Sequence, residues 1–388
     1  MGERHAEVIG GGIGGLTAAT ALAQHGWTVR LHERQSAIRA VGAGIYVWDN
    51  GLSALESIGA FDTAADGAHL GPAFEAHGHH GRVLYRLDIN SPGHPRCYTL
   101  LRDKLIDALV SAATEAGVEL MTDSAAVAAT PDGALVFEDG STGSAELVVA
   151  ADGVHSRLRD HLGQPGHRIR MRQGAARMMV PMSSEYFSPE DAIKHHEFFH
   201  RNRRLLYTPC TADEVYLAFV SNVDDAATRG SHIDVTSWQR SFPTLGPLLD
   251  ATRDVPFLRW DTFEYIRLSS WSQGRVAFLG DAAHAQPPYL GQGGGTAMTN
   301  AVALAATVSR PGRSVHDALV EWEREHRPGV ERTQRTSYRM RLLNVVPDAI
   351  RNPLLSLAGR TSTFTNSQLA ATRLRAVTSA EPTWNGRR

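Results

Sequence analysis

The chain has 388 residues, of which 42% are hydrophobic and 21% charged, and its formal net charge is −2 at pH 7. This length allows two domains or one large one, and the composition is ordinary for a globular protein. So small a net charge excludes a global field that would recruit nucleic acid or an anionic membrane, so we expect neither partner.

The cysteines and the N-terminal residues indicate the compartment. Cys97 and Cys210 are the two cysteines, too few for a disulfide framework or a zinc pattern. We therefore expect free thiols in a reducing cytosol. Glu3 and Glu7 interrupt any signal peptide, and no run of about 18 apolar residues predicts a transmembrane helix. These observations predict a cytoplasmic protein.

The first elements predict a strand–helix–strand unit. A short strand ends at Gly10, a helix follows over residues 16–25, Gly26 ends that helix, and a second strand covers residues 27–33. This unit of about 30 residues is the context that a glycine-rich nucleotide-binding motif requires.

The turn inside this unit fits the pattern G-x-G-x-x-G at Gly10, Gly12 and Gly15, with Gly14 beside them. The glycines permit a tight turn, so that helix N–H groups can approach a pyrophosphate. Glu33, about 20 residues further on, can accept hydrogen bonds from ribose hydroxyls. A glycine-rich turn without a ligand is the alternative, but the combined pattern favours a dinucleotide site.

Two more segments of this kind each follow an apolar strand. Asp152 and Gly153 follow the strand over residues 147–151, and Gly280 and Asp281 follow the strand over residues 276–279. An aspartate there can bind ribose or ribityl hydroxyls, although an ordinary Asx turn is the alternative for the first segment. The intervening N-terminal sequence predicts helices over 50–59 and 101–116 and β-like segments over 118–121 and 134–137.

The third segment continues through Gly291, Gly293 and Gly294 into a helix expected over residues 293–306. The N terminus of that helix favours nearby negative charge, such as that of a reduced flavin, whereas a flexible loop is the alternative. We expect His284 to be a packing or hydrogen-bonding residue, because no second metal ligand lies at a supporting spacing. No metal site is predicted.

Between the second and third segments the sequence becomes β-like. Residues 168–180, 197–209 and 214–220 predict an inserted antiparallel sheet. The fold class is therefore α/β: a Rossmann-like FAD-binding domain of the GR2 type with an inserted antiparallel β-sheet substrate domain and C-terminal helices. The expected bounds are 1–165 and 268–345 for the FAD-binding domain, 166–267 for the substrate domain, and 346–388 for a C-terminal helical segment and tail.

The C-terminal part predicts one long helix followed by a break. Residues 315–341 are largely helical in pattern, and the stretch from Pro347 to Pro353 is expected to interrupt that helix. Residues 361–388 predict a short helix and a polar tail.

The three segments, in this order from about Glu7 to Arg341, resemble the fingerprints of the class A FAD-dependent aromatic hydroxylases, typified by para-hydroxybenzoate hydroxylase. The resemblance implies that FAD is bound along its length and reduced by NADH or NADPH as co-substrate. Oxygen would then add to the flavin as a C4a-hydroperoxide, whose distal OH is transferred to an electron-rich ring. The cofactor supplies that chemistry, and the protein supplies position and dryness.

Residues 5–60, 205–210 and 280–284 further resemble the branch with 2-methyl-3-hydroxypyridine-5-carboxylate oxygenase and 5-pyridoxate oxygenase. That resemblance implies a substrate pocket with Arg204 and Tyr216, and Pro288 beside the flavin ring. It also assigns further residues to FAD: Arg34, Gly44, Arg102 and Val127. A surface arginine and a core tyrosine are the alternatives for the first pair.

We therefore expect a monooxygenase that hydroxylates a small acidic hydroxylated aromatic or hydroxypyridine, with or without ring opening. Hydroxylation of a salicylate-like or polyketide phenol without ring opening is one alternative, and a non-catalytic FAD-binding protein is another. The loop over residues 286–292 departs from the pyridine oxygenases, and the histidine-rich region 68–95 matches poorly. Asn300 stands where the wider hydroxylase family often has an aspartate. A homo-oligomer is left open, as is the choice between NADH and NADPH.

Overall fold

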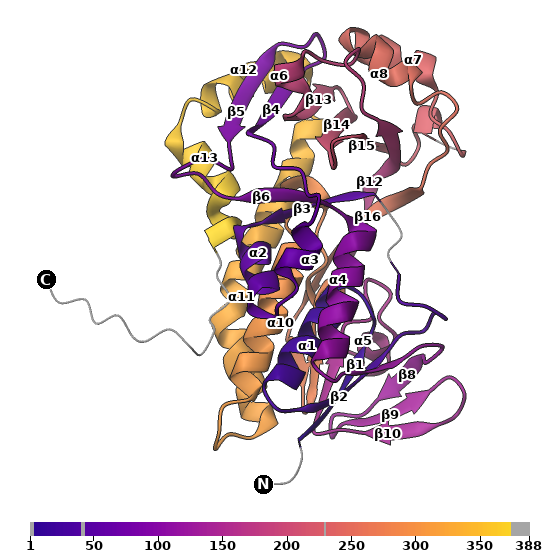
Figure 1. Cartoon of the computed structure of the whole chain (residues 1–388), viewed down its shortest axis with the longest axis vertical. Helices are drawn as coiled ribbons and strands as arrows, with labels where there is room; N and C mark the ends of the chain where they lie inside the picture. Colours follow the sequence, from indigo (N-terminus) through magenta and orange to yellow (C-terminus); the bar gives the residue numbers. More distant parts are fainter. Residues whose placement is uncertain (1–3, 40–42, 229, 374–388) are drawn as a thin grey trace, which may run out of the picture.

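The computed structural model describes residues 4–39, 43–228 and 230–373. Figure 1 shows a six-stranded sheet with its helices in the lower half and a seven-stranded sheet in the upper half. A two-stranded ribbon, β3 (Gly44–Trp48) and β6 (Cys97–Leu101), lies between them. The predicted α/β fold class is confirmed.

The six-stranded sheet has the order β17-β18-β11-β1-β2-β7. Its strands are parallel except for β17 and β18, which pair antiparallel. The central strands are buried on both faces, which explains their continuous apolar sequences. The strands are β1 (His5–Ile9), β2 (Thr28–His32), β7 (Glu119–Met121), β11 (Leu147–Ala150), β17 (Ser272–Gln273) and β18 (Val276–Phe278).

Helices flank this sheet, and a three-stranded sheet lies beside it (Figure 1). The predicted long C-terminal helix is present as α11, although it contains Pro328. The helices are α1 (Ile13–Gln24), α4 (Arg102–Glu115), α5 (Arg157–His161), α9 (Asp281–His284), α10 (Gly293–Val308) and α11 (Val315–Met340), with α2 (Asp49–Ser57) and α3 (Phe61–Ala65) above them; the small sheet is β8 (Ala126–Ala129), β9 (Ala134–Phe137) and β10 (Thr142–Ser144).

The seven-stranded sheet has the order β16-β12-β15-β14-β13-β4-β5. Its outer face carries Leu205, Leu217 and Phe219, which share an apolar core with Trp238. Its inner face carries Arg204 and lies against Gly44 of β3 and Tyr289 of the loop over residues 286–292. The strands are β4 (Ala73–Gly78), β5 (Val83–Asp88), β12 (Gly166–Pro181), β13 (His195–His200), β14 (Arg203–Pro209), β15 (Glu214–Asn222) and β16 (Arg259–Leu268), and the outer helices are α6 (Pro189–Ala192), α7 (Val235–Ser241) and α8 (Gly246–Asp250).

This sheet differs from the expected one in three respects. The expected segment 166–267 holds most of the strands, but β4 and β5 come from residues 73–88. The sheet is not purely antiparallel, because β13 pairs with β4 in parallel. The predicted run 197–209 is two strands joined by a turn at Arg201 and Asn202, where Arg201 has a φ of 48°. Arg201 is exposed in this turn.

The predicted break over 347–353 is wrong in its position. The chain leaves α11 through a 3-10 helix, Arg341–Asn344, and helix α12 already begins at Asp348 and continues to Ala358 with Pro353 inside. Pro347 precedes the first helical residue, where its fixed φ is compatible with a helix start. A further short helix, α13 (Ser362–Leu369), precedes residues 374–388, which lie outside the described part. The remaining 3-10 helices are Ala226–Thr228, Pro243–Leu245, η3 (Pro288–Leu290) and Ala370–Arg373.

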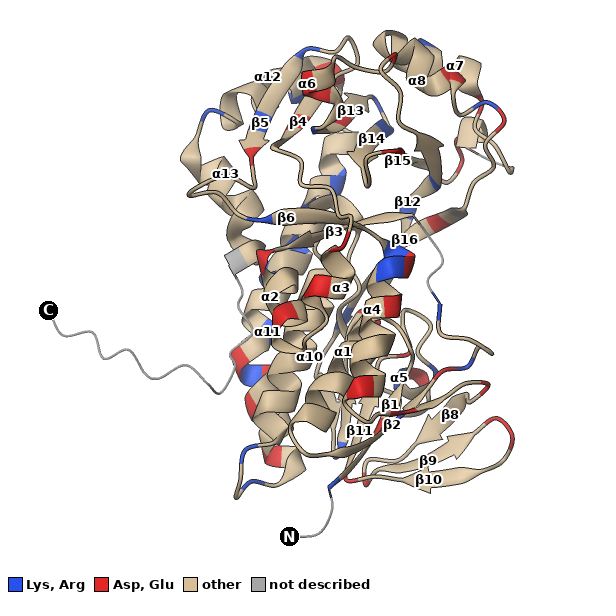
Figure 2. Ribbon diagram, viewed as in Figure 1, with Lys and Arg blue, Asp and Glu red and all other residues tan. Residues whose placement is uncertain are grey.

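Two expectations from composition can be compared with the fold. Cys97 and Cys210 are free thiols, as predicted, and the structure shows that both are buried. Among the described residues, no helix combines the length and apolarity needed to cross a membrane. Figure 2 shows acidic and basic residues spread over both halves of the ribbon.

Candidate active site

The three glycine-bearing segments meet at one edge of the six-stranded sheet. Each follows directly on a parallel strand, and these strands, β1, β11 and β18, are neighbours. The register places Ile9 beside Ala150, and Ala150 beside Phe278, so the three strands end at the same level. Ligands of open α/β sheets bind at this carboxyl edge.

Close backbone approach explains the glycines of the first segment. A Cβ at Gly10, whose φ is 109°, would lie 2.5 Å from the carbonyl oxygen of Ala151. A Cβ at Gly15 would overlap the carbonyl oxygen of Gly10, and one at Gly14 would lie 3.4 Å from Ala297 Cβ. By contrast, Gly12 is exposed and has nothing within 4 Å of its Cβ position. Gly10 and Gly15 are therefore required by packing, whereas Gly12 leaves the start of α1 open.

The starts of α1 and α10 are both suited to bind negative charge. Neither helix has a side-chain cap or an acidic residue in its first turn. At α10, Gly293 is exposed and Gly294 is half-buried beside Ile45 and Ile13. Gln292 precedes them; its Oε1 accepts from Asn50 Nδ2 at 3.0 Å, and its Nε2 is buried without a partner in the described chain.

Two acidic side chains lie at the same edge. Glu33 Oε2 accepts a hydrogen bond from the Gly11 N–H at 2.9 Å, which fixes the carboxylate beside the first glycine turn. Asp152 Oδ1 is buried and has no partner among the described residues. Burial raises the Asp152 pKa, against hydrogen bonds that include one from Ser156. An unpartnered carboxylate oxygen beside uncapped helix starts fits a ligand that offers hydroxyl groups, as FAD does.

Other residues assigned to FAD from the sequence are placed as follows. Gly153 has a φ of 82° and Gly280 a φ of 63°, both in the left-handed region that favours glycine, and Asp281 is exposed. Arg34 is exposed after β2, Val127 is half-buried in β8, and Arg102 begins α4, where its N–H donates to Ala43 O at 3.2 Å. Pro288 is exposed at the start of η3, and Gly291, with a φ of 61°, packs on Tyr46 and Trp48.

Arg204 lies on the inner face of the seven-stranded sheet and is 3% exposed. Its guanidinium forms an ion pair with Glu197 on the adjacent strand. It also lies over the rings of Phe199 and Tyr289, at 5.0 and 4.9 Å from their centroids. Burial lowers its pKa to about 10, so it remains protonated at neutral pH. Its Nε and Nη1 atoms are buried without partners in the described chain.

Tyr216 lies on the same face but further along the sheet. The register places Arg204 opposite Val220, and Tyr216 opposite Thr208. Burial raises the pKa of the Tyr216 hydroxyl, and a hydrogen bond from Arg177 opposes this shift. Gly44 allows β3 to approach here, because a Cβ at Gly44 would lie 3.2 Å from Tyr216 Cβ and overlap Cys210 Sγ.

Sequence reasoning missed the aromatic surroundings of Arg204. Tyr46 hydrogen-bonds to Thr208, and Tyr289 to Gln173. Glu197 was also missed, although the polar turn at Arg201 and Asn202 would have placed it on the same face as Arg204.

His195 is a further inner-face residue that the sequence did not single out. It is 1% exposed, and both ring nitrogens lack partners in the part of the chain that is described. Its ring lies 4.6 Å from that of Phe74 and 5.2 Å from that of Tyr46. Burial lowers its pKa well below the usual value, so His195 is neutral.

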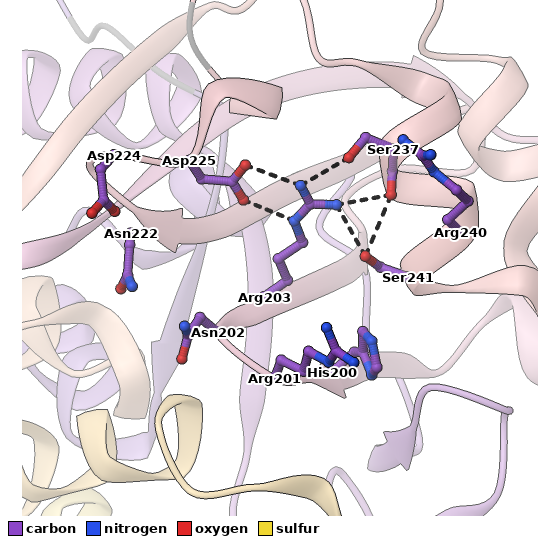
Figure 3. A pocket seen from close by; sticks show the side chains of 10 residues that line it. All are labelled: His200, Arg201, Asn202, Arg203, Asn222, Asp224, Asp225, Ser237, Arg240 and Ser241. Atoms are coloured by element: carbon purple, nitrogen blue, oxygen red, sulfur yellow. Dashed lines mark hydrogen bonds and ion pairs between the residues drawn. The ribbon is translucent and has the colours of Figure 1, made fainter.

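A cavity of about 640 Å³ lies at the end of the sheet, around Arg203 rather than Arg204. Because these two residues are successive in a strand, their side chains point to opposite faces. Figure 3 shows Arg203 held between Asp225 on one side and Ser237 and Ser241 on the other. This arginine uses its donors within the fold, so the cavity is a poorer candidate for the active site.

His284 is a hydrogen-bonding residue in the core, as expected. Its Nε2 lies 3.2 Å from Asn300 Nδ2, and its ring lies 5.2 Å from that of Trp271. Arg159, which the sequence did not single out, links the second and third segments. Its Nη1 donates to Ala282 O at 3.2 Å and its Nη2 to Val154 O at 3.1 Å.

The fold and the site define a flavin-dependent monooxygenase of the aromatic hydroxylase type. Residues 4–346 match the family described as FAD binding domain, and the chain belongs to that family. Its relatives and structural neighbours are FAD-dependent monooxygenases, for which NAD(P)H is the typical co-substrate.

Two curated relatives cover nearly the whole chain. The chain is 60% identical over 375 residues to a probable 2-heptyl-3-hydroxy-4(1H)-quinolone synthase of Rhodococcus erythropolis, covering 97% of each chain. It is 59% identical over 373 residues to a 2-heptyl-3-hydroxy-4(1H)-quinolone synthase of Mycobacteroides abscessus, covering 96% of this chain and 99% of the relative. Among solved structures, the tetrameric form of 2-methyl-3-hydroxypyridine-5-carboxylic acid oxygenase is 38% identical, covers 96% of this chain and 97% of its own, and has a TM-score of 0.84. The resemblance stated from the sequence is thus confirmed.

Proposed function

We propose that this enzyme hydroxylates the 3-position of a 2-alkyl-4(1H)-quinolone and leaves the ring intact. The net reaction would consume NAD(P)H, O₂ and a proton. One oxygen atom would enter the C3–H bond of the ring, and the other would leave as water. This chemistry is what the names of the two quinolone synthases imply for those relatives.

The observation that carries the proposal is the buried ion pair between Arg204 and Glu197. A buried guanidinium with its own carboxylate presents no net charge to a substrate, and a second carboxylate would have to compete with Glu197. An uncharged ring with a carbonyl group avoids that competition. This argument favours a quinolone over the acidic aromatic that the sequence alone suggested.

The residues around Arg204 suit such a ring. The side chains of Phe199 and Tyr289 flank the guanidinium, and apolar Leu206 follows on the same sheet face. Aromatic surfaces exclude water and stack on flat rings. The Nε and Nη1 atoms of Arg204 lack partners in the described chain, and an N–H group of one of them would donate to the carbonyl oxygen at C4 of the quinolone and orient it.

FAD, when bound, takes a hydride from NAD(P)H and activates O₂. Gly10, Gly12 and Gly15 would hold its pyrophosphate against α1, and Glu33 its ribose. Asp152 and Asp281 would accept hydrogen bonds from its hydroxyl groups. Gly293 and Gly294, at the uncapped start of α10, would stabilise negative charge on the flavin ring, and Pro288 and Gly291 would lie beside that ring. The chain therefore positions the two reactants and supplies donors, with no covalent step of its own.

The test is oxidation of NADH and of NADPH in air by the purified holoenzyme. We expect 2-heptyl-4(1H)-quinolone to accelerate oxidation and to yield a product that has gained one oxygen atom and keeps its aromatic absorbance. Hydroxypyridine carboxylates and hydroxybenzoates should leave oxidation near background. Stimulation by an acid instead, with loss of aromatic absorbance, would replace the quinolone assignment with ring-opening oxygenation.

A further inference from the structure

Three potential metal ligands meet on the outer face of the seven-stranded sheet, opposite Arg204. Glu75 and His77 lie two residues apart on β4, and His196 pairs with Glu75 across the parallel strands. The three residues are 7%, 7% and 3% exposed. Their ligand atoms lie within 4.8 Å of one another, and we call them the β4–β13 triad.

The hydrogen bonds of the two histidines cannot all be satisfied by neutral rings. His77 Nδ1 lies 3.2 Å from Gly81 O, and His196 Nε2 lies 2.7 Å from Asp191 O. The remaining nitrogens, His77 Nε2 and His196 Nδ1, lie 3.0 Å apart. Carbonyl oxygens only accept, so these three contacts require three N–H hydrogens, whereas two neutral imidazoles carry two. If both hydrogen bonds to carbonyl oxygens are kept, the lone pairs of His77 Nε2 and His196 Nδ1 face each other without a hydrogen between them.

The surroundings oppose a third proton. The ring of Phe187 stacks on His196 at 4.7 Å, and that of Phe198 stacks on His77 at 4.7 Å. Both rings are also buried, His77 at 7% and His196 at 3% exposed, and burial disfavours the charged form of an imidazole. Two cations, Arg86 and Lys194, already lie 3.1 and 3.4 Å from Glu75 and offset the charge of its carboxylate.

We propose that the β4–β13 triad binds a divalent metal ion of the zinc class, with His77 Nε2, His196 Nδ1 and Glu75 Oε2 as ligands. The metal would use both lone pairs, and each histidine would keep its N–H bond to a backbone carbonyl, the usual second partner of a metal-bound imidazole. This site revises our expectation from the sequence, which predicts no metal.

The spacing is close to that of a zinc site. Ligands at 2.0–2.1 Å from a tetrahedral zinc ion lie about 3.3 Å apart. The nitrogen pair is at 3.0 Å, and Glu75 Oε2 lies 3.6 Å from His77 Nε2 and 4.0 Å from His196 Nδ1. Small side-chain rotations would equalise these distances.

The second carboxylate oxygen of Glu75 is held by cations. Arg86 Nη1 lies 3.1 Å from Glu75 Oε1, and Lys194 Nζ lies 3.4 Å from it. These contacts orient Oε2 toward the histidines. The two cations are themselves offset by other carboxylates, since Lys194 lies 2.7 Å from Asp191 and Arg86 lies 2.7 Å from Asp88. The site thus has the negative charge that a divalent cation needs.

A second histidine cluster nearby serves as a contrast. His79 Nδ1 and His200 Nδ1 lie 3.3 and 2.7 Å from Asp348 Oδ2, and Arg351 lies 2.7 Å from the other oxygen of Asp348. Here a carboxylate, and not a second imidazole, faces the Nδ1 atom of each histidine. His200 Nδ1 hydrogen-bonds to Asp348, whereas His79 Nδ1 lies near the same oxygen without a hydrogen bond. The hydrogen bonds of this cluster therefore do not force two nitrogen lone pairs together.

The experiment is metal analysis of the purified holoenzyme, before and after incubation with zinc and removal of excess metal. We expect about one zinc ion per chain after loading. The paired variant His77→Gln with His196→Gln should lose about nine tenths of it or more, because removal of both imidazoles leaves Glu75 as the single remaining ligand of the proposed site. Zinc should also raise the thermal midpoint of the native chain but not that of the paired variant.

Two matched controls test whether these histidines in particular bind the metal. His200→Gln removes a histidine from the contrast cluster, and His80→Gln removes an exposed histidine of the β4–β5 turn. Both should keep full zinc. The proposal is overturned if His200→Gln loses zinc or if the paired variant keeps it. It is also overturned if the native chain holds no zinc after loading.

X-ray absorption at the zinc edge of the native chain gives a result that does not depend on the folding of any variant. Scattering from two imidazoles is expected, and a shell without imidazole would contradict the site.

Discussion

Replacement of Glu197 by glutamine tests the charge balance that our substrate assignment rests on. Arg204 is 3% exposed and Glu197 15% exposed, so this ion pair lies in a poorly hydrated environment. Removal of one partner from a buried pair costs about 3–5 kcal/mol, because the other charge is left uncompensated. The lower end applies here, since the glutamine amide still accepts a hydrogen bond and Glu197 retains some contact with water.

At roughly 2 °C per kcal/mol for a chain of this size, a cost of about 3 kcal/mol lowers the thermal midpoint by about 6 °C. The same variant leaves an unbalanced guanidinium beside the substrate ring. We therefore expect kcat/KM for 2-heptyl-4(1H)-quinolone to fall and activity with acidic hydroxyaromatics to rise. The assay is thermal unfolding of Glu197→Gln together with NAD(P)H oxidation over both substrate classes.

Glu214→Gln is the matched control, because Glu214 is an exposed glutamate on β15, the strand that pairs with the strand of Arg204. It should match the native chain in both measurements. If Glu197→Gln also retains the native midpoint and the native substrate preference, the buried pair does not set the charge of the pocket, and our reasoning is refuted.

Three further predictions concern the same site. Arg204→Lys keeps the charge but loses the planar donors, so we expect a decrease of about 10–100-fold in kcat/KM for the quinolone, and unchanged steady-state kinetics would exclude Arg204 from substrate binding. Gly12→Ala should leave apoprotein stability unchanged and weaken FAD binding, because its Cβ would enter open space at the start of α1. Gly15→Ala should destabilise the apoprotein, because its Cβ would overlap Gly10 O. Equal thermal midpoints for the two apoprotein variants would contradict this distinction. Asp152→Asn should stabilise the apoprotein at pH 7, because burial raises the Asp152 pKa and folding therefore disfavours the ionised form. This gain in stability should vanish as the pH falls below the pKa of an aspartate in the unfolded chain, about 3.9. A gain in stability that persists below that pH would show another cause.

The nucleotide-binding edge was predictable because its signals are local. Each glycine-bearing segment follows its own apolar strand, and parallel strands of one sheet end at a common edge. The sequence therefore placed Gly10, Asp152 and Gly280 together without any long-range information. The bounds of the long helix over residues 315–341 followed from periodicity in the same way.

The substrate sheet was harder to predict, because its decisive contacts are not local. β4 pairs with β13 in parallel, and no hairpin turn marks such a pair. The partner of Arg204 was also missed, since the run over residues 197–209 has no glycine or proline before Pro209 to reveal the turn at Arg201 and Asn202. With that turn placed, Glu197 falls on the same face as Arg204.

The insertion of β4 and β5 into the distant sheet also constrains how this chain is made. β4 leaves the ribosome long before β13, its partner, so its hydrogen-bonding edge must wait for more than a hundred further residues. Until then, β4 and β5 form only a two-stranded hairpin, which is marginally stable in water. The β4–β5 hairpin should therefore stay unpaired until β13 has been made, and it depends on protection from aggregation during that interval. For the same reason, transplanting the substrate specificity of one such enzyme onto another requires moving residues 73–88 together with the segment that begins at β12.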